Sequence, residues 1–352
     1  MNPPYTVEHK LYGHSAAITT VLFSPSGDSI LSCGEDGNIF VWDATTGLEI
    51  HRLRIQTPAC CNLATWISWD SNESNTPSAL VCAYDNGTIA LWSIDIARPR
   101  SLATDLDHES RSAPKASFIP HQGKSLSAMA SHNNRVATAA RGEVHLYSVA
   151  SVDGNVFFSL RWSLLSQFSG SIVSHLSFFK NGDIINVSYM YEKTLLEIDT
   201  FTGKELRRLL LPYTIGLAIP SNVGDQLIIY NTKTGLNVID LLLFELTDLS
   251  LPLPLVTRPA ICGACCDAST IITHDEDQNI YIWDSSSGIL QQTIHSCYGT
   301  ISCIAGKELN GRSPTGASKG QFAVAFKRPA GAPSSGKTPH YLLIWTQEGK
   351  SH

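Results

Sequence analysis

One stretch decides the fold: GHSAAITTVLFSPSGDSILSCGEDGNIFVWD, which covers residues 13–43. Its apolar residues fall into three short runs, separated by residues 24–28 and 35–38. Serine, proline, glycine and aspartate between such runs favour tight turns, and Asp36-Gly37 is a strong hairpin signal. The stretch therefore predicts three short antiparallel strands in succession.

Residues 260–284 repeat much of this pattern. Asp277 precedes Trp283 by six residues, as Asp36 precedes Trp42 in the first stretch, and an aspartate follows each tryptophan. A pattern that recurs within one chain indicates a repeated structural unit.

Gly13-His14 at one end of the first stretch and Trp42-Asp43 at the other resemble a WD-repeat unit, one blade of a β-propeller. The resemblance implies a buried hydrogen-bond chain of histidine, second-strand hydroxyl, turn aspartate and tryptophan. The matching residues are His14, Ser32, Asp36 and Trp42 in the first unit, and Thr273, Asp277 and Trp283 in the second, which has no preceding Gly-His.

The rest of the chain contains weaker units. We place five of them, starting near residues 62, 126, 172, 215 and 299. The last unit lacks an outer strand, and residues 6–11 form a lone strand; in the family such a strand completes the last blade. We therefore predict an all-β fold, a seven-bladed β-propeller in a single domain of residues 1–352, with the ring closed by the N-terminal strand joining the last blade. Inserted loops are expected at about residues 95–114, 306–320 and 328–339.

Several details of the weak units stay open. Six or eight blades are alternatives to seven. In the third unit Tyr147 stands at the tryptophan position and Arg141-Gly142 at the turn, so we expect this unit to have lost its hydrogen-bond chain. Residues 241–246 are rich in leucine and have a helical alternative, with an outer strand expected near residues 253–257.

Composition limits the partners. Only 16% of residues are charged and the formal net charge is −6, so we expect neither direct nucleic-acid binding nor attraction to an anionic membrane. The first residues contain no apolar run of the kind that a secretory signal or membrane span requires. We therefore expect no membrane insertion and an intracellular location, in the cytoplasm or nucleus.

The nine cysteines are spread over the expected strands, and Cys82 stands where Ser32 stands in the first unit. We interpret them as small buried hydrophobic residues, and expect no metal site, disulfide or cofactor.

A histidine near a serine and an aspartate also suggests nucleophilic catalysis. We prefer the structural interpretation because the spacing and the nearby Trp42 match the repeat, and because acidic residues recur at equivalent turns. No His-Glu-x-x-His motif is present, and the twelve histidines are dispersed. We expect no catalytic residues and no enzymatic activity.

In a closed ring, the residues at equivalent turns project onto one rim around the central channel. The resemblance implies that this rim is a common docking face, with Glu35, Asp85, Arg141 and Glu276 as candidate partner-binding residues. The set is mostly acidic, so we expect a protein or peptide partner with basic segments. The alternative is that these are solvated turn residues, and nothing in the sequence indicates an oligomeric state.

The function that we expect is that of a noncatalytic protein-interaction scaffold or adaptor, as a subunit of a multiprotein assembly. One alternative is a substrate receptor of a ubiquitin ligase. Family members of that kind often carry arginine two residues after the WD aspartate, whereas Ala44-Thr45 follow Asp43 here. The other alternative is a propeller enzyme with a channel active site, for which the sequence offers no convergent residues.

Overall fold

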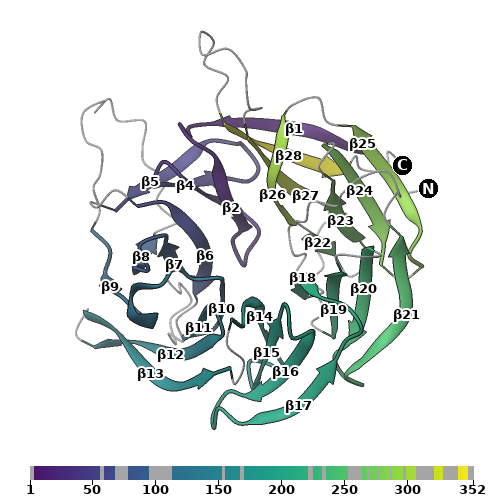
Figure 1. The fold of residues 1–352 in the computed structure, drawn as a ribbon. Helices are drawn as coiled ribbons and strands as arrows, with labels where there is room; N and C mark the ends of the chain where they lie inside the picture. Colours follow the sequence, from purple (N-terminus) through teal and green to yellow (C-terminus); the bar gives the residue numbers. More distant parts are fainter. Residues whose placement is uncertain are drawn as a thin grey trace.

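The structure is a computed structural model. It describes residues 4–55, 59–67, 78–94, 113–152, 155–166, 170–220, 225–231, 235–252, 264–267, 270–275, 278–285, 287–295, 299–306, 321–327 and 340–347. Within these ranges the chain forms seven four-stranded sheets arranged around a central axis (Figure 1). The predicted all-β, seven-bladed propeller is confirmed.

Blades 1 to 3 are each built from four consecutive strands. Blade 1 consists of β2 (Ile18–Phe23), β3 (Ser29–Gly34), β4 (Asn38–Asp43) and β5 (Glu49–Arg54). Blade 2 consists of β6 (Cys61–Ile67), β7 (Ser78–Tyr84), β8 (Ile89–Ile94) and β9 (Ala116–Phe118). A short 3₁₀ turn, η1 (His121–Gly123), precedes blade 3, which consists of β10 (Ala128–His132), β11 (Arg135–Ala140), β12 (Glu143–Val152) and β13 (Asn155–Leu165).

Blades 4 to 6 repeat the same order. Blade 4 consists of β14 (Val173–Phe179), β15 (Ile184–Tyr189), β16 (Thr194–Asp199) and β17 (Glu205–Leu210). Blade 5 consists of β18 (Ile215–Pro220), β19 (Gln226–Asn231), β20 (Gly235–Asp240) and β21 (Glu245–Pro252). Blade 6 consists of β22 (Ala264–Asp267), β23 (Thr270–His274), β24 (Asn279–Asp284) and β25 (Leu290–His295).

Blade 7 combines the two ends of the described chain. Its inner strands are β26 (Thr300–Gly306), β27 (Gln321–Lys327) and β28 (Tyr341–Gln347), and its outer strand is β1 (Tyr5–Tyr12). β1 pairs antiparallel with β28, from Tyr5 opposite Gln347 to Tyr12 opposite Tyr341. The predicted closure of the ring by the N-terminal strand is confirmed.

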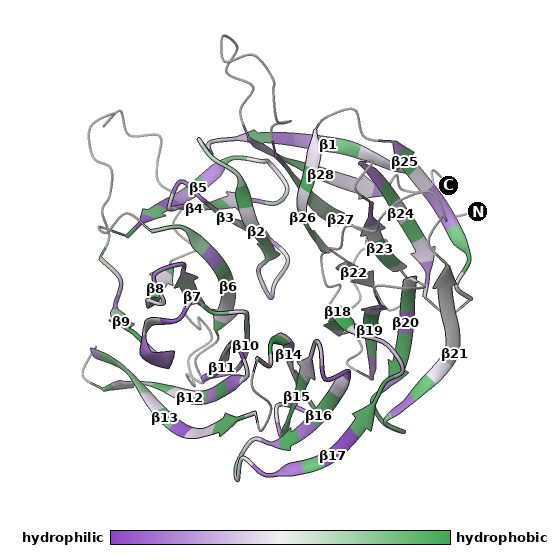
Figure 2. Cartoon of the chain, viewed as in Figure 1, coloured by the Kyte–Doolittle hydropathy of each residue, from purple (hydrophilic) through white to green (hydrophobic). Residues whose placement is uncertain are grey.

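The hydrophobic core is divided among the junctions between blades. The first strand of each blade contacts the first strands of both neighbouring blades, so β2, β6, β10, β14, β18, β22 and β26 form a closed inner ring. Among the described residues, each of the seven junctions contains one buried apolar cluster. Middle strands such as β3 are buried on both faces, because neighbouring blades cover each face. Outer strands such as β13 alternate between exposed and half-buried residues, and Figure 2 shows the matching alternation of hydropathy.

Some details differ from the sequence-based expectations. The helical alternative for residues 241–246 is wrong: residues 241–244 form a turn, and β21 starts at Glu245, earlier than the expected outer strand. The outer strand of blade 3, β13, was not expected from the sequence. The expected inserts fall almost wholly on residues outside the described ranges, so these loops and the single domain stay predictions.

In the described part of the chain, no helix is long and apolar enough to cross a membrane.

Candidate functional site

In blade 1 the structure brings His14, Ser32, Asp36 and Trp42 together. Trp42 Nε1 donates to Ser32 Oγ at 2.9 Å, and Ser32 Oγ lies 2.9 Å from His14 Nε2. His14 Nδ1 lies 3.1 Å from Asp36 Oδ1. Because Ser32 has a single proton, a consistent assignment has Ser32 donating to His14 and His14 donating to Asp36. The four side chains thus form one continuous chain from the tryptophan to the turn.

Asp36 is the negative end of this chain. Its carboxylate also accepts hydrogen bonds from the backbone N–H groups of Ser15, at 2.8 Å, and Asn38, at 3.0 Å. Burial by itself raises the pKa of Asp36, but the hydrogen bonds from His14 and from the backbone N–H groups of Asn38 and Ser15 outweigh burial and hold this pKa well below its ordinary value. Asp36 is therefore ionised whenever the protein is folded near neutral pH.

Three of the four proposed rim residues lie in the described structure. Glu35, Asp85 and Arg141 are exposed, in the turns between the second and third strands of blades 1, 2 and 3. The blades share one strand order around the ring, so these turns lie on the same face, called here the turn face. Glu276 lies outside the described residues. The described rim is divided, with acidic residues on blades 1 and 2 and a basic residue on blade 3.

A groove of about 700 Å³ lies where blade 3 meets blade 4. It reaches the turn face, because Arg141 and Gly142 of the blade 3 turn line it, together with Lys124 and Glu143. Lys124 and Arg141 are exposed. No sequence motif indicates this groove, since it lies between two of the units with weak motifs.

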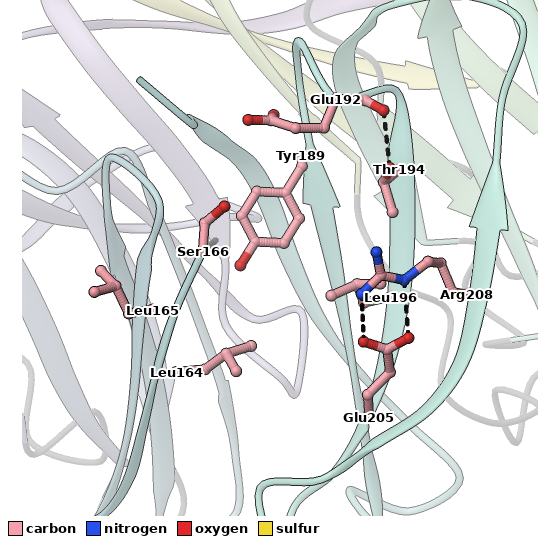
Figure 3. A pocket seen from close by; sticks show the side chains of 9 residues that line it. All are labelled: Leu164, Leu165, Ser166, Tyr189, Glu192, Thr194, Leu196, Glu205 and Arg208. Carbon is pink, nitrogen blue, oxygen red and sulfur yellow. Dashed lines mark hydrogen bonds and ion pairs between the residues drawn. The ribbon is translucent and has the colours of Figure 1, made fainter. Parts of the chain in front are cut away.

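A smaller pocket of about 80 Å³ adjoins the groove and shares Leu165 and Ser166 with it (Figure 3). Leu164, Leu196 and the ring of Tyr189 supply most of its apolar wall. Leu165 is 72% exposed, so an apolar side chain borders the pocket on the protein surface. The pocket has room for about one aliphatic side chain.

Polar groups complete the wall of this pocket. Arg208 donates to both carboxylate oxygens of Glu205, at 2.9 and 2.7 Å, so this pair is mutually satisfied (Figure 3). Glu192 differs: its Oε1 accepts a hydrogen bond from Ser171, whereas its Oε2 is buried and has no partner among the described residues. An unpaired buried carboxylate oxygen is unusual in a folded protein. The pocket is therefore apolar with one unsatisfied negative group.

Comparison with known proteins identifies the repeat. Residues 5–43 match the family model described as WD domain, G-beta repeat. This segment of the chain is a WD40 repeat. The structure also resembles the Myceliophteria thermophila Cps50 (Swd1) β-propeller domain, with a TM-score of 0.67, 15% identity and coverage of 98% of this chain and 100% of that chain. That likeness concerns the fold alone.

Curated relatives match this WD40 chain over short segments. The methylosome protein WDR77 of Xenopus laevis is 32% identical over 96 residues, 27% of this chain and 27% of the relative. Striatin-4 of Homo sapiens is 25% identical over 93 residues, 26% of this chain and 12% of the relative. WD repeat-containing protein 1 of Xenopus tropicalis is 28% identical over 102 residues, 29% of this chain and 16% of the relative. The matches thus span about a quarter or less of the length of these relatives.

Blade 6 keeps part of the WD40 hydrogen-bond chain. Trp283 Nε1 donates to Thr273 Oγ1 at 3.0 Å. Asp277 lies outside the described residues, so its expected role stays a prediction. The structure shows a buried carboxylate that the sequence analysis missed: Asp275 accepts hydrogen bonds from Asn279 and, at 2.7 Å, from the Tyr281 hydroxyl. The sequence pattern selects aspartates only by their distance from the tryptophan, and Asp275 does not lie at that distance.

Blade 3 was expected to have lost its WD40 chain; it lacks the turn carboxylate and the tryptophan but keeps the link between histidine and hydroxyl. His121 Nε2 lies 2.9 Å from Thr138 Oγ1, and His121 Nδ1 lies 3.2 Å from Glu143 Oε2. The other oxygen of Glu143 lies 2.8 Å from His145 Nε2, and His145 Nδ1 lies 2.8 Å from the Tyr147 hydroxyl. The carboxylate has moved from the turn to the start of the third strand. Burial lowers the pKa of His121, and the nearby His145 lowers it further.

Two short sequence matches to catalytic motifs lie outside the described residues. GAPSSGKT at residues 331–338 has the letters of a phosphate-binding loop, and GASKG at 316–320 those of a nucleophile elbow. Both motifs require a strand followed by a helix. In this propeller each match instead lies between two paired antiparallel strands of blade 7, β27 and β28 for the first and β26 and β27 for the second. The flanking elements therefore do not support either match.

Proposed function

We propose that this WD40 propeller is a noncatalytic protein-interaction scaffold or adaptor within a multiprotein assembly. The observation that carries the proposal is the pocket at the junction of blades 3 and 4, where Glu192 Oε2 is unsatisfied beside an apolar wall. A partner peptide fits this site if it inserts an aliphatic side chain against the apolar wall and places a lysine or arginine beside the half-buried Glu192, whose negative charge attracts it. The larger groove then holds the adjoining peptide backbone.

The alternative of catalysis by blade 1 finds no support in the geometry. Ser32 is completely buried, and its hydroxyl is shared between Trp42 and His14. A nucleophile needs a substrate carbonyl within reach, which a fully buried hydroxyl does not have. We propose that the hydrogen-bond chain of blade 1 has a structural role.

We also propose that the turn face contributes to docking through Glu35, Asp85, Arg141 and Glu276. The opposite charges on blades 1–2 and on blade 3 favour a partner whose basic segment lies over Glu35 and Asp85 and whose acidic segment lies over Arg141. One relative is named a methylosome protein, and this name agrees with the proposed role as a subunit of an assembly. Five free cysteines in the described structure fit a reducing compartment, the cytoplasm or nucleus.

The test uses tagged full-length protein, affinity purification and quantitative mass spectrometry. Glu192→Gln removes the unsatisfied charge with little change of shape, and Leu165→Glu places charge on the exposed border of the pocket. We expect each variant to reduce recovery of a specific partner by at least about tenfold, which equals about 1.4 kcal/mol of binding free energy. Leu48→Glu is the matched control, because Leu48 is 68% exposed and lies in blade 1. Glu35→Lys combined with Asp85→Lys tests the turn face separately.

Two results would contradict these proposals. Unchanged recovery of every partner by both pocket variants would show that the pocket does not bind a partner. A wild-type protein that recovers no partner above a tag-only background ends the scaffold assignment itself.

A further inference from the structure

Three cysteines that are far apart in the sequence meet at the junction of blades 1 and 2. Cys33 lies on β3 of blade 1, and Cys61 and Cys82 lie on β6 and β7 of blade 2. Their sulfur atoms all lie within 4.8 Å of one another. All three side chains are completely buried, within one apolar cluster. The interpretation of the cysteines as isolated hydrophobic residues therefore misses their convergence.

Two hydrogen-bond donors in the same buried cluster lack an acceptor. The strand register places Cys82 opposite Ala90, as Ser32 is placed opposite Phe40 in blade 1. Trp92 is the counterpart of Trp42, but the serine that would accept its N–H is replaced by Cys82. Trp92 Nε1 and the Tyr84 hydroxyl are both buried and lie close enough to interact with each other, but neither has a well-aligned hydrogen bond among the described residues.

Buried donors without acceptors indicate a missing negative charge at this place. Thiolates supply such a charge, but three of them together in an apolar core are stable only around a cation. The site has three sulfur donors, and no histidine, aspartate or glutamate in the described structure joins the group. Structural zinc sites almost always have four ligands, whereas thiolate ligands also suit the softer Cu(I), which accepts three.

We propose that Cys33, Cys61 and Cys82 bind one Cu(I) ion as a three-coordinate thiolate site, with Tyr84 and Trp92 donating hydrogen bonds to the sulfurs. Binding of one Cu(I) releases three thiol protons to solvent, involves no change of oxidation state and leaves the site with a net charge of −2, which the Tyr84 and Trp92 donors face. Deprotonated sulfur accepts hydrogen bonds better than a thiol does, so occupancy satisfies both orphaned donors. The ion also links blade 1 to blade 2.

The second cluster of possible metal ligands gives weaker support for a bound ion. His121, Glu143 and His145 in blade 3 also lie within 4.8 Å of one another. Their imidazole nitrogens and both carboxylate oxygens, however, already lie within 3.2 Å of a polar partner in the same chain. Most of this cluster is therefore satisfied by hydrogen bonds within the protein, and His121 Nδ1, which lacks a well-aligned hydrogen bond, lies 3.2 Å from the Glu143 carboxylate.

The test is an anaerobic titration of the purified, reduced full-length protein with Cu(I) in competition with the chromophoric chelator bicinchoninate. We expect one Cu(I) per chain to be retained against the chelator, a near-ultraviolet sulfur-to-copper charge-transfer band, and a rise in melting temperature. Cys82→Ser is the decisive variant, because serine restores the hydroxyl that accepts the tryptophan N–H in blade 1. This variant should fold, lose the band and retain no copper.

Cys60→Ser and Cys303→Ser are the matched controls. Cys60 is adjacent to Cys61 but outside the cluster, and Cys303 is buried in blade 7. Both variants should keep one Cu(I) and the full band. The proposal is overturned if the wild-type protein retains no Cu(I), if folded Cys82→Ser retains as much as wild type, or if Cys60→Ser abolishes binding. Tight binding of Zn(II) in place of Cu(I) would likewise overturn the three-coordinate assignment.

Discussion

In blade 1 the hydroxyl of Ser32 accepts a hydrogen bond from Trp42 and donates one to His14. The equivalent residue is Thr138 in blade 3 and Thr273 in blade 6, and each of these hydroxyls has a polar partner. In blade 2 the same position holds Cys82, and the tryptophan is left without an acceptor. At this position blade 2 therefore carries sulfur where blades 1, 3 and 6 carry a hydroxyl oxygen.

The first residue-scale prediction concerns Asp36→Ala. The substitution leaves His14 Nδ1 and the backbone N–H groups of Ser15 and Asn38 without their acceptor. We expect the free energy of unfolding to fall by about 1–3 kcal/mol, measured by chemical denaturation. Asp28→Ala is the control, because Asp28 is exposed in the preceding turn. Equal stability of wild type and Asp36→Ala would count against the network.

The second residue-scale prediction concerns pH. The pKa of Asp36 is lowered from 3.8 in the folded protein, so the unfolded chain binds this proton more readily. The stabilisation by ionised Asp36 is complete above the unfolded pKa and is lost as pH falls below it. The stability difference between wild type and Asp36→Asn should thus be constant between roughly pH 5 and 7 and should narrow below about pH 4. A difference that widens in acid would refute this sign.

At the scale of elements, β1 has two distinct faces. Tyr5 and Leu11 are buried against blade 7 or blade 1, whereas Thr6, Glu8 and Lys10 are exposed. The strand also covers the edge of β28, which would otherwise present unpaired backbone groups. One face of β1 therefore supplies apolar packing while its backbone completes the sheet.

This strand gives an element-scale prediction. Leu11→Ala opens a cavity where β1 packs between blades 7 and 1, and we expect a loss of about 2–5 kcal/mol in the free energy of unfolding. Thr6→Ala on the exposed face of the same strand is the control and should change stability little. Similar effects of the two substitutions in urea denaturation would show that β1 does not pack as described.

At the scale of the whole molecule, the ring is closed by pairing and not by a covalent link. Tyr5 lies opposite Gln347, so the start of β1 is next to the end of β28. The blade clusters then form an unbroken circle, in which blade 7 depends on residues from both ends of the described chain. Stability should therefore depend on which segments are present and not on where the chain begins.

A circular permutant tests this. A chain that starts at residue 13, continues to residue 352 and ends with residues 1–12 should fold with a melting temperature close to that of the wild type, because the start of β1 at Tyr5 lies opposite the end of β28 at Gln347. Simple deletion of residues 1–12 should instead lower the melting temperature strongly or cause aggregation. Loss of the folded β-sheet spectrum in the permutant by circular dichroism would contradict this closure.

The parts that could be predicted are those encoded by neighbouring residues. Three strands of blade 1 lie within residues 13–43, and the turn at Asp36-Gly37 sets their pairing. Closure by β1 also followed from the sequence, since the last unit lacked a strand that the N-terminus could supply. The chain of blade 3 could not be found this way, because its carboxylate comes from Glu143 and not from the expected turn residue.

The sequence by itself thus determined most of the strands and turns and favoured seven blades over six or eight, because hairpin pairing involves residues close together along the chain. Only the tertiary structure decided what lies between blades: the thiol cluster of Cys33, Cys61 and Cys82, and the pocket with the unsatisfied Glu192. The physical reason is that a junction joins side chains from separate sheets. Their meeting depends on the register and packing of whole blades, which no local pattern specifies.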